Sequence, residues 1–354
     1  MTGFPMMMAY QEVGVVPPPS ASIIALSLAA APYIAAYAWD DSTGYGTKYA
    51  NPSTPSGSQA SNITFSPSGS SLVVAHASAA TAWTDAYQWN DLTGFGSRFT
   101  TSSGSIGYDV AFSPSGGSLA VAMNITSTLG LVVYHWSDST GFGATFTPPT
   151  GFPSSGVFRG VSFSPSGGAM ALTSFNSPFI IAAPWNDTTG FGTRYSNPAI
   201  LPTSEGLKVK FSPSGSSIIV ALDLTPFVAA YAWNDATGFG TKFSNPVILP
   251  DRSTNLAFSP SGSSVAFSQS SSPRISVYPW SDITGFGAKF SDPVSIPTSG
   301  TTDVAFSSSG LSIAVSHSSS PYVTTYQWGD TTGFGLKFSN PAVLPGAGTG
   351  VTFK

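Results

Sequence analysis

A single motif recurs seven times along the chain at an almost constant spacing, and it limits the possible folds more than any other feature. Each copy reads Trp-Asn-Asp-x-Thr-Gly-Phe-Gly or a close variant, and successive motif tryptophans are 47 to 50 residues apart. A period in this range, with several short strands in each unit, is typical of propeller blades. The motif tryptophans are Trp39, Trp89, Trp136, Trp185, Trp233, Trp280 and Trp328.

Each repeat is predicted to contain four short strands. The first ends in an aliphatic-x-Phe triplet such as Val209-Lys210-Phe211, and a Ser-Pro-Ser-Gly turn follows it in five copies. The second strand is apolar, the third runs up to the tryptophan, and the fourth begins at Gly-Phe-Gly. A Lys or Arg lies nine residues after six of the seven tryptophans. Because such charges hinder edge-to-edge pairing, we expect the fourth strand at the outer edge and the triplet strand at the centre.

The two ends of the chain complement each other. The repeats begin with a second strand near Ile23 and end with a first strand at residues 350–354. We therefore predict an all-β fold, a seven-bladed β-propeller of four-stranded antiparallel blades over residues 22–354, with the last blade closed by the N- and C-terminal strands. Residues 1–21 match no repeat and are predicted to form an extended tail or anchor.

Composition excludes several classes of function. Charged residues make up 8% of the chain, against about 25% in typical globular proteins. The net charge is −4 and the few Lys and Arg are dispersed, so we expect no nucleic-acid binding. The apolar segment from Ile23 to Trp39 contains Pro32 and is shorter than the roughly 20 residues of a membrane span. No Lys or Arg precedes Lys48, so we expect no secretory signal.

The repeat resembles the WD-repeat β-propeller family over roughly residues 22–354. The resemblance rests on Phe-Ser-Pro-Ser-Gly and on the tryptophan that closes the third strand. The sequence departs from that family because its Asp follows the Trp by two positions and no Gly-His pair precedes the inner strand. The Thr-Gly-Phe-Gly and Ser-Asn-Pro motifs are more similar to those of propeller arrays in tailed bacteriophages. This second resemblance implies a virion protein.

No residue pattern indicates a catalytic or metal site. One Asp per repeat is expected to cap the amides of its own turn, because a calcium site needs ligands that converge on one point. His76, His135 and His317 have no Ser or carboxylate at catalytic spacing. We therefore predict no cofactor and no enzyme activity. The repeated aspartates are Asp41, Asp91, Asp138, Asp187, Asp235, Asp282 and Asp330.

Irregular repeats are the better candidates for binding, because variable loops on a constant scaffold often carry function. The loop between the second and third strands should share a face with the inter-blade linkers, opposite the Ser-Pro-Ser-Gly turns. Lys210 is the one charge at a small inner-strand position, and the sequence leaves two alternatives for it: facing the channel or pairing locally. The candidate binding residues are Trp83, Asp85, Asn124, Thr126, Lys208 and Lys210, and those of a docking tail are Met6, Met7, Met8, Pro17, Pro18 and Pro19.

These observations lead to a predicted function with two alternatives. The first is a non-enzymatic phage virion protein for structure or adsorption, located in the virion and bound to other assembly proteins through residues 1–21. The second is a lectin-like propeller that binds a carbohydrate such as a host surface glycan, with Trp83 stacking on the sugar. The third is a cellular scaffold for protein interactions.

Overall fold

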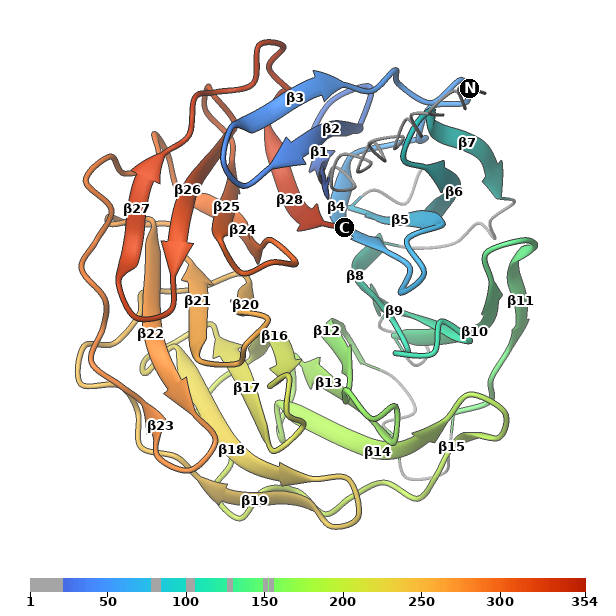
Figure 1. Ribbon diagram of the computed structural model, residues 1–354. Coiled ribbons are helices and arrows are strands. Elements are labelled where there is room, and N and C mark those ends of the chain that lie inside the picture. The colour runs from blue at the N-terminus through green and yellow to red at the C-terminus, as the bar shows by residue number, and fades with distance from the viewer. Residues whose placement is uncertain (1–21, 78–83, 100–105, 126–129, 149–151, 153–155) are drawn as a thin grey trace, which may run out of the picture.

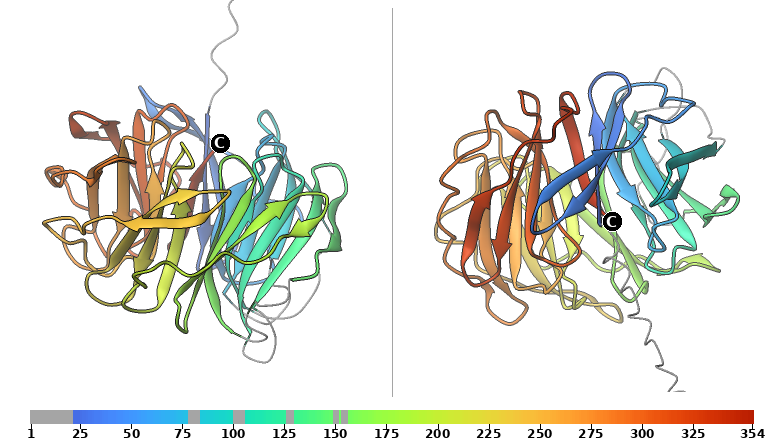
Figure 2. Two further views of the ribbon diagram at one scale, coloured as in Figure 1. Left: turned by 90° about the horizontal axis from the view of Figure 1, so that it is seen from below. Right: turned by 45° about the horizontal axis from the view of Figure 1, so that its top comes forward.

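The structure, a computed structural model, describes residues 22–77, 84–99, 106–125, 130–148, 152 and 156–354. These residues form 28 strands in seven four-stranded antiparallel sheets, which stand as blades around a common axis (Figure 1). The side view in Figure 2 shows that the blades together form one flattened ring. The predicted all-β, seven-bladed propeller is therefore confirmed. Among the residues described, no helix has the length and apolar character needed to cross a bilayer.

Each blade is built from consecutive strands, except the first. Blade 1 contains β28 (Gly348–Phe353), β1 (Ser22–Leu28), β2 (Ile34–Asp40) and β3 (Gly44–Lys48); blade 2 contains β4 (Ala60–Phe65), β5 (Ser71–His76), β6 (Thr84–Asn90) and β7 (Gly94–Phe99); blade 3 contains β8 (Ile106–Phe112), β9 (Ser118–Asn124), β10 (Leu131–Ser137) and β11 (Gly141–Thr145). Blade 4 contains β12 (Phe158–Phe163), β13 (Ala169–Ser174), β14 (Ile180–Asn186) and β15 (Gly190–Phe191); blade 5 contains β16 (Gly206–Phe211), β17 (Ser217–Leu222), β18 (Val228–Asn234) and β19 (Gly238–Lys242). Blade 6 contains β20 (Leu256–Phe258), β21 (Ser264–Ser268), β22 (Ile275–Ser281) and β23 (Gly285–Phe286); blade 7 contains β24 (Thr301–Phe306), β25 (Ser312–His317), β26 (Val323–Gly329) and β27 (Gly333–Lys337).

The C-terminal strand closes the ring as predicted. β28 pairs antiparallel with β1, with Ile24 opposite Phe353 and Leu26 opposite Val351. The Lys354 amide donates to the Ile23 carbonyl at 2.9 Å and extends this ladder by one bond. Blade 1 thus takes its inner strand from one end of the chain and its other three strands from the opposite end.

The hydrophobic core lies between neighbouring blades. Trp233 of blade 5 contacts Phe239 of its own outer strand and Phe211 of its own inner strand edge-to-face, with ring centroids 5.0 and 5.1 Å apart. Tyr195 of blade 4 meets the same indole at 5.2 Å. Edge-to-face packing suits aromatic rings because the positive ring edge meets the negative ring face. Equivalent aromatic contacts surround the other six motif tryptophans, so the core consists of one repeated junction.

The motif aspartate completes this junction and corrects our expectation of its role. The indole Nε1 of Trp233 donates to Asp235, and the Ser164 hydroxyl of blade 4 donates to the other carboxylate oxygen at 2.9 Å. The amides of the turn itself are capped by the preceding residue: Asn234 Oδ1 accepts from the Ala236 amide at 2.8 Å. The aspartate therefore joins two blades and does not cap its own turn. The third residue of the turn also donates across the blades, from Ser166 to Asp235, and the equivalent bonds join Ser68 to Asp138, Ser115 to Asp187, Ser214 to Asp282, Ser261 to Asp330, and Ser309 to Asp41.

One junction has to be built differently, because β28 and β1 are not connected by a Ser-Pro-Ser-Gly turn. There the ammonium of Lys354 forms an ion pair with Asp91 of blade 2. The last side chain of the chain thus takes the place of the missing turn serine. The carboxylate of Asp91 also accepts from the indole of Trp89 at 2.8 Å, as in the other blades.

Replacing Trp233 by Ala is expected to lower the free energy of unfolding by about 3–5 kcal/mol, because it opens a large cavity at one junction. Urea or thermal unfolding measures the change. Leu92→Ala is the matched control, because Leu92 is 91% exposed and should leave the unfolding free energy nearly unchanged. A Trp233→Ala protein as stable as its parent would contradict the junction described above.

Candidate active site at the channel mouth

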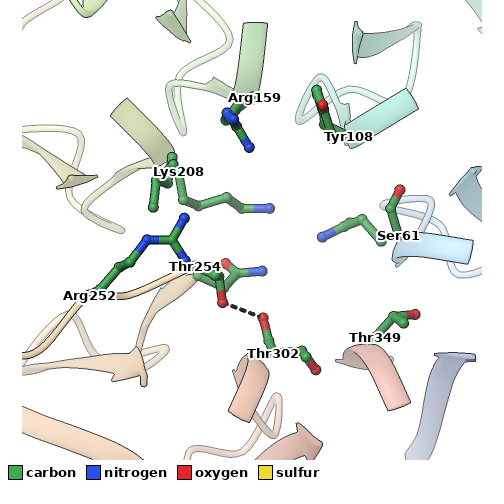
Figure 3. Close-up of a pocket in the computed structure, with 11 residues that line it drawn as sticks. Ser61, Tyr108, Arg159, Lys208, Arg252, Thr254, Thr302 and Thr349 are labelled. Atoms are coloured by element: carbon green, nitrogen blue, oxygen red, sulfur yellow. Dashed lines mark hydrogen bonds between the residues drawn. The ribbon is translucent and has the colours of Figure 1, made fainter. Parts of the chain in front are cut away.

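Seven residues, one close to the start of each inner strand, form a ring of side chains at one end of the central channel. Residues at the same repeat position lie at the same height along the axis of a ring of equivalent blades. The position four residues before the closing Phe of each inner strand lines a cavity of about 240 Å³ (Figure 3). Most of these side chains are polar, unlike the apolar strands around them. They are Ser61, Tyr108, Arg159, Leu207, Thr254, Thr302 and Thr349.

Two arginines bring positive charge to this mouth, and each is held by a carboxylate. Arg159 Nε pairs with Glu205, and Arg252 Nε pairs with Asp223 Oδ1 at 2.5 Å. Both ion pairs are made through Nε, and both arginines also line the cavity. Figure 3 shows Arg159, Arg252 and Lys208 approaching the cavity from neighbouring blades. Because a guanidinium offers two parallel N–H groups, this geometry suits a carboxylate or phosphate ligand.

The carboxylate of Glu205 is itself affected by this arrangement. Burial raises its pKa, the Arg159 charge lowers it, and the neighbouring Asp223 carboxylate raises it again, with a net upward shift. The Asp223 amide donates to the Glu205 carbonyl at 3.0 Å, which fixes the two acidic residues side by side. Arg159 also lies over the Tyr108 ring, 5.2 Å from its centroid. The two guanidinium groups are thereby held in place before any ligand binds.

One position further along the inner strands, a buried ion pair spans three blades. Lys208 Nζ of blade 5 lies 2.6 Å from Asp109 Oδ1 of blade 3, and both side chains are buried. The pair can form because the residue between them in blade 4 is Gly160, where an added Cβ would lie 2.9 Å from the Lys208 backbone. Asp109 also accepts the amides of Val110 and Val161, both at 3.0 Å. This carboxylate is therefore fully occupied.

Asp303 occupies the same repeat position in blade 7, and a glycine, Gly350, again follows in the next blade. Its carboxylate accepts the amides of Val304 and Val351 at 2.7 and 2.9 Å. The residue equivalent to Lys208 in this sector is Asn62, which carries no charge. Burial raises the pKa of Asp303 to about 6, although the charges of Lys208 and Lys210 and the two amides act in the opposite direction.

A second cavity of about 200 Å³ continues the mouth into the channel and is lined by Asp303, Lys208 and Lys210 among others. Lys210 thus lies on the channel wall, the first of the two possibilities left open by the sequence. Burial and then the neighbouring charge of Lys208 lower the pKa of Lys210 to about 8. The upper cavity therefore holds the arginines, and the lower cavity holds Asp303, a carboxylate whose pKa is raised by burial.

Asp85 lies inside blade 2 and not on a binding surface. Its carboxylate contacts His76 Nε2 and Ser56 Oγ, both at 2.9 Å, and forms an ion pair with Arg98. Sequence spacing placed no Ser or carboxylate with a histidine, but strand register does: Asp85 pairs with Val74, which makes it a diagonal neighbour of His76. The cluster is no catalytic triad, because Ser56 and Asp85 meet the same ring nitrogen and His76 is fully buried.

The remaining predicted site residues are placed less centrally. Asn124 lines a side cavity of about 440 Å³ whose wall shares Tyr108 and Arg159 with the mouth. Trp83, Thr126 and the tail residues Met6 to Met8 and Pro17 to Pro19 lie outside the described residues, so docking through the tail stays a prediction. Within the described part of the chain, no group of three or more His, Asp or Glu side chains is arranged to hold a metal ion.

Sequence reasoning missed most of the mouth, although the repeat contained a signal. Aligned on the closing Phe, the inner strands carry polar residues at positions where a buried strand would ordinarily be apolar. Lys208 was identified, but its partner Asp109 and the arginines were not. The missed residues are Asn62, Tyr108, Asp109, Arg159, Arg252, Asn255 and Asp303.

Three solved structures share this fold over nearly the whole chain. A candidate 6-phosphogluconolactonase from Bacteroides uniformis is 16% identical with a TM-score of 0.69, covering 95% of this chain and 100% of its own. One from Bacteroides fragilis is 11% identical with a TM-score of 0.70, covering 95% and 98%. The periplasmic gluconolactonase of Pseudomonas aeruginosa is 17% identical with a TM-score of 0.69, covering 94% and 99%. No protein-family model matches the chain, and no curated protein matches it in sequence.

These comparisons correct our sequence-based predictions of function. The similar structures are named as lactonases and are neither WD-repeat nor phage proteins, so the predicted virion or adsorption role and the predicted lack of enzyme activity are wrong. At these identities the likeness itself establishes the fold alone. The sequence of the repeat motif was a poor guide to function because the motif residues determine how blades pack. Blade packing is common to propellers of many functions.

Replacing Asp303 by Asn is expected to change the pH dependence of stability. The folded pKa of about 6 lies above the ordinary value of about 3.9, so the wild type should lose stability as pH rises between these values. The loss is about 3 kcal/mol, and the Asn variant should not show it. Urea unfolding of both proteins from pH 4 to pH 7 gives the difference, which removes the contribution of all other groups. Parallel curves for the two proteins would contradict a raised pKa of Asp303.

Proposed function

We propose that the channel mouth binds the lactone of an anionic sugar acid and hydrolyses it. The observation that carries this proposal is the placement of two carboxylate-held arginines, Arg159 and Arg252, above Asp303, a carboxylate without a lysine partner of its own. The names of the similar structures, 6-phosphogluconolactonase and gluconolactonase, support this class of substrate.

The upper cavity supplies the binding groups. The Nη groups of Arg159 and Arg252 would bind the phosphate or carboxylate of the ligand with charge-assisted hydrogen bonds. Thr254, Thr302 and Asn62 line the rest of the wall and offer hydroxyl and amide groups to the sugar hydroxyls. The anion would thereby orient the lactone ring toward the lower cavity.

The lower cavity supplies the chemistry. Asp303 takes a proton from a water molecule, and the water oxygen bonds to the carbonyl carbon of the lactone. The ester C–O bond of the ring then breaks, and the departing ring oxygen takes the proton back from Asp303 to become a hydroxyl. The product is the open hydroxy acid, and Asp303 is restored. The Lys208 ammonium stabilises the negative charge that develops on the carbonyl oxygen.

The pKa of Asp303 suits this role, because a general base works best when its pKa lies near the working pH. With a pKa of about 6, the carboxylate is ionised at neutral pH and still basic enough to accept a proton. Asp109, at the equivalent position, cannot serve in this way because Lys208 holds it as an ion pair.

The test is hydrolysis of 6-phosphogluconolactone and gluconolactone by the purified chain, measured by acid release and corrected for spontaneous opening. Wild type should be active, and kcat should rise with pH through about 6 as Asp303 ionises. Asp303→Asn should lower kcat by about 10²–10⁴-fold and abolish this pH dependence. Arg159→Gln and Arg252→Gln should each raise KM for the phosphorylated lactone by about tenfold or more.

Lys48→Gln is the matched control, because Lys48 lies on the outer strand β3 and should leave both constants unchanged. A folded wild type that opens neither lactone faster than water does would contradict the proposal. Activity that survives in Asp303→Asn with the same pH profile would contradict the assigned base.

A further inference from the structure

Four successive inter-blade linkers expose large aliphatic side chains, which together we call the aliphatic arc. The linkers follow β15, β19, β23 and β27, on the lower and left sides of the ring in Figure 1. Val247 and Val294 are as exposed as in an extended peptide, at 102% and 108%. The arc consists of Ile200, Leu201, Val247, Ile248, Leu249, Val294, Ile296, Val343 and Leu344.

Buried tyrosines hold the backbone of these linkers in place. The hydroxyl of Tyr231 donates to the Ile200 carbonyl and that of Tyr278 to the Ile248 carbonyl, both at 2.9 Å. Tyr326 and Tyr37 bind the equivalent linkers at Ser295 and Val343, at 2.6 and 2.8 Å. The backbone is thus anchored to the blade while the aliphatic side chains face solvent. The arc is a preformed surface.

The fold itself does not require apolar residues at these positions. The linker between blades 1 and 2 is anchored by the same bond, from the Tyr87 hydroxyl to the Thr54 carbonyl at 3.1 Å. That linker carries Ser53 and Thr54 where the arc carries Val, Ile or Leu, and both are exposed. Since the same anchor works with polar side chains, the aliphatic residues serve something outside the ring.

The arc is suited to a flat partner. Equivalent repeat positions lie at one height along the ring axis, so the four linkers lie near a common plane. Because the strands of a blade alternate in direction, the linkers end on the same face as the channel mouth. Large aliphatic side chains that are exposed in each of four successive linkers indicate contact with another protein or with a membrane.

Charge and composition distinguish between these two partners. Residues 194–202, 242–252, 289–297 and 337–345 together carry five Lys or Arg and two Asp, a net charge of +3 in a chain of net charge −4. The large apolar side chains that these linkers expose are all aliphatic, whereas the residues that dominate protein interfaces are Trp, Tyr and Arg, with Leu and Val under-represented. Aliphatic side chains next to basic residues match the acyl chains and headgroups of an anionic bilayer.

We infer that the aliphatic arc binds the surface of an anionic lipid bilayer, as a peripheral contact that does not cross it. The Val and Ile side chains of the linkers enter the boundary between headgroups and acyl chains. The basic residues that precede them, such as Lys242 and Lys337, lie close to the lipid phosphates.

The full-length chain can be tested by flotation with vesicles of phosphatidylcholine alone and of phosphatidylcholine mixed with phosphatidylglycerol. Wild type should bind the mixed vesicles more strongly than the neutral ones, and added salt should weaken the binding. The double variant Val247→Asp/Val294→Asp should bind at least about tenfold more weakly. The control Leu92→Asp/Ile283→Asp changes residues that are 91% and 89% exposed in the turns of the opposite face, and should bind like wild type.

Thermal melting establishes that both variants are folded, which their exposure favours. No binding of wild type to either kind of vesicle would overturn the inference, and so would an equal loss in the control variant. Size-exclusion chromatography with light scattering gives the remaining outcome. A wild-type dimer that the Val247→Asp/Val294→Asp variant splits, without any vesicle binding, would identify the arc as a contact between copies and overturn the inference.

Discussion

Every blade is joined to the next by a buried tryptophan whose indole is held by an aspartate that also binds the neighbouring blade. In the junction of blades 7 and 1, Asp41 accepts from Trp39 at 2.9 Å and from Ser309 and Ser312 at 2.5 and 2.6 Å. Burial opposes ionisation of Asp41, but the combined hydrogen bonds hold its pKa below the ordinary value. Such a carboxylate stabilises the fold at neutral pH and loses this effect as pH falls through its lowered pKa.

The repeated junction sets all inner strands at one height, and the mouth depends on this alignment. Departures from the repeat then create the site. Gly160 and Gly350 stand at the same repeat position, where an added Cβ would press on the backbone of the next blade at Lys208 and Asn62, 2.9 and 3.3 Å away. Lys208 carries a charge and Asn62 does not. One carboxylate is therefore locked in an ion pair, while the other stays basic in a channel below two arginines.

The fold could be predicted from the sequence because blade packing depends on residue patterns that are local and repeat along the chain. The 47–50-residue period, the aromatic positions and the complementary ends were sufficient for seven blades and for closure by β28. The site could not be predicted in the same way. The pair of Lys208 and Asp109 joins residues 99 positions apart and depends on a side chain that Gly160 lacks. Likewise, His76 meets Asp85 through strand register, which residue spacing alone does not reveal.

The central claim is that the ring is one closed unit whose terminal strand is as secure as any other inner strand. Native-state hydrogen exchange of β28, compared with that of β16 on the other side of the ring (Figure 1), tests this most directly. The amides that bond across the ladders of β28 with β1 and of β16 with β17 should exchange with similar protection, because freeing β28 requires the ring to open. Fast exchange throughout β28 with slow exchange in β16 would show that β28 detaches locally while the rest of the ring stays folded. That result would contradict the account.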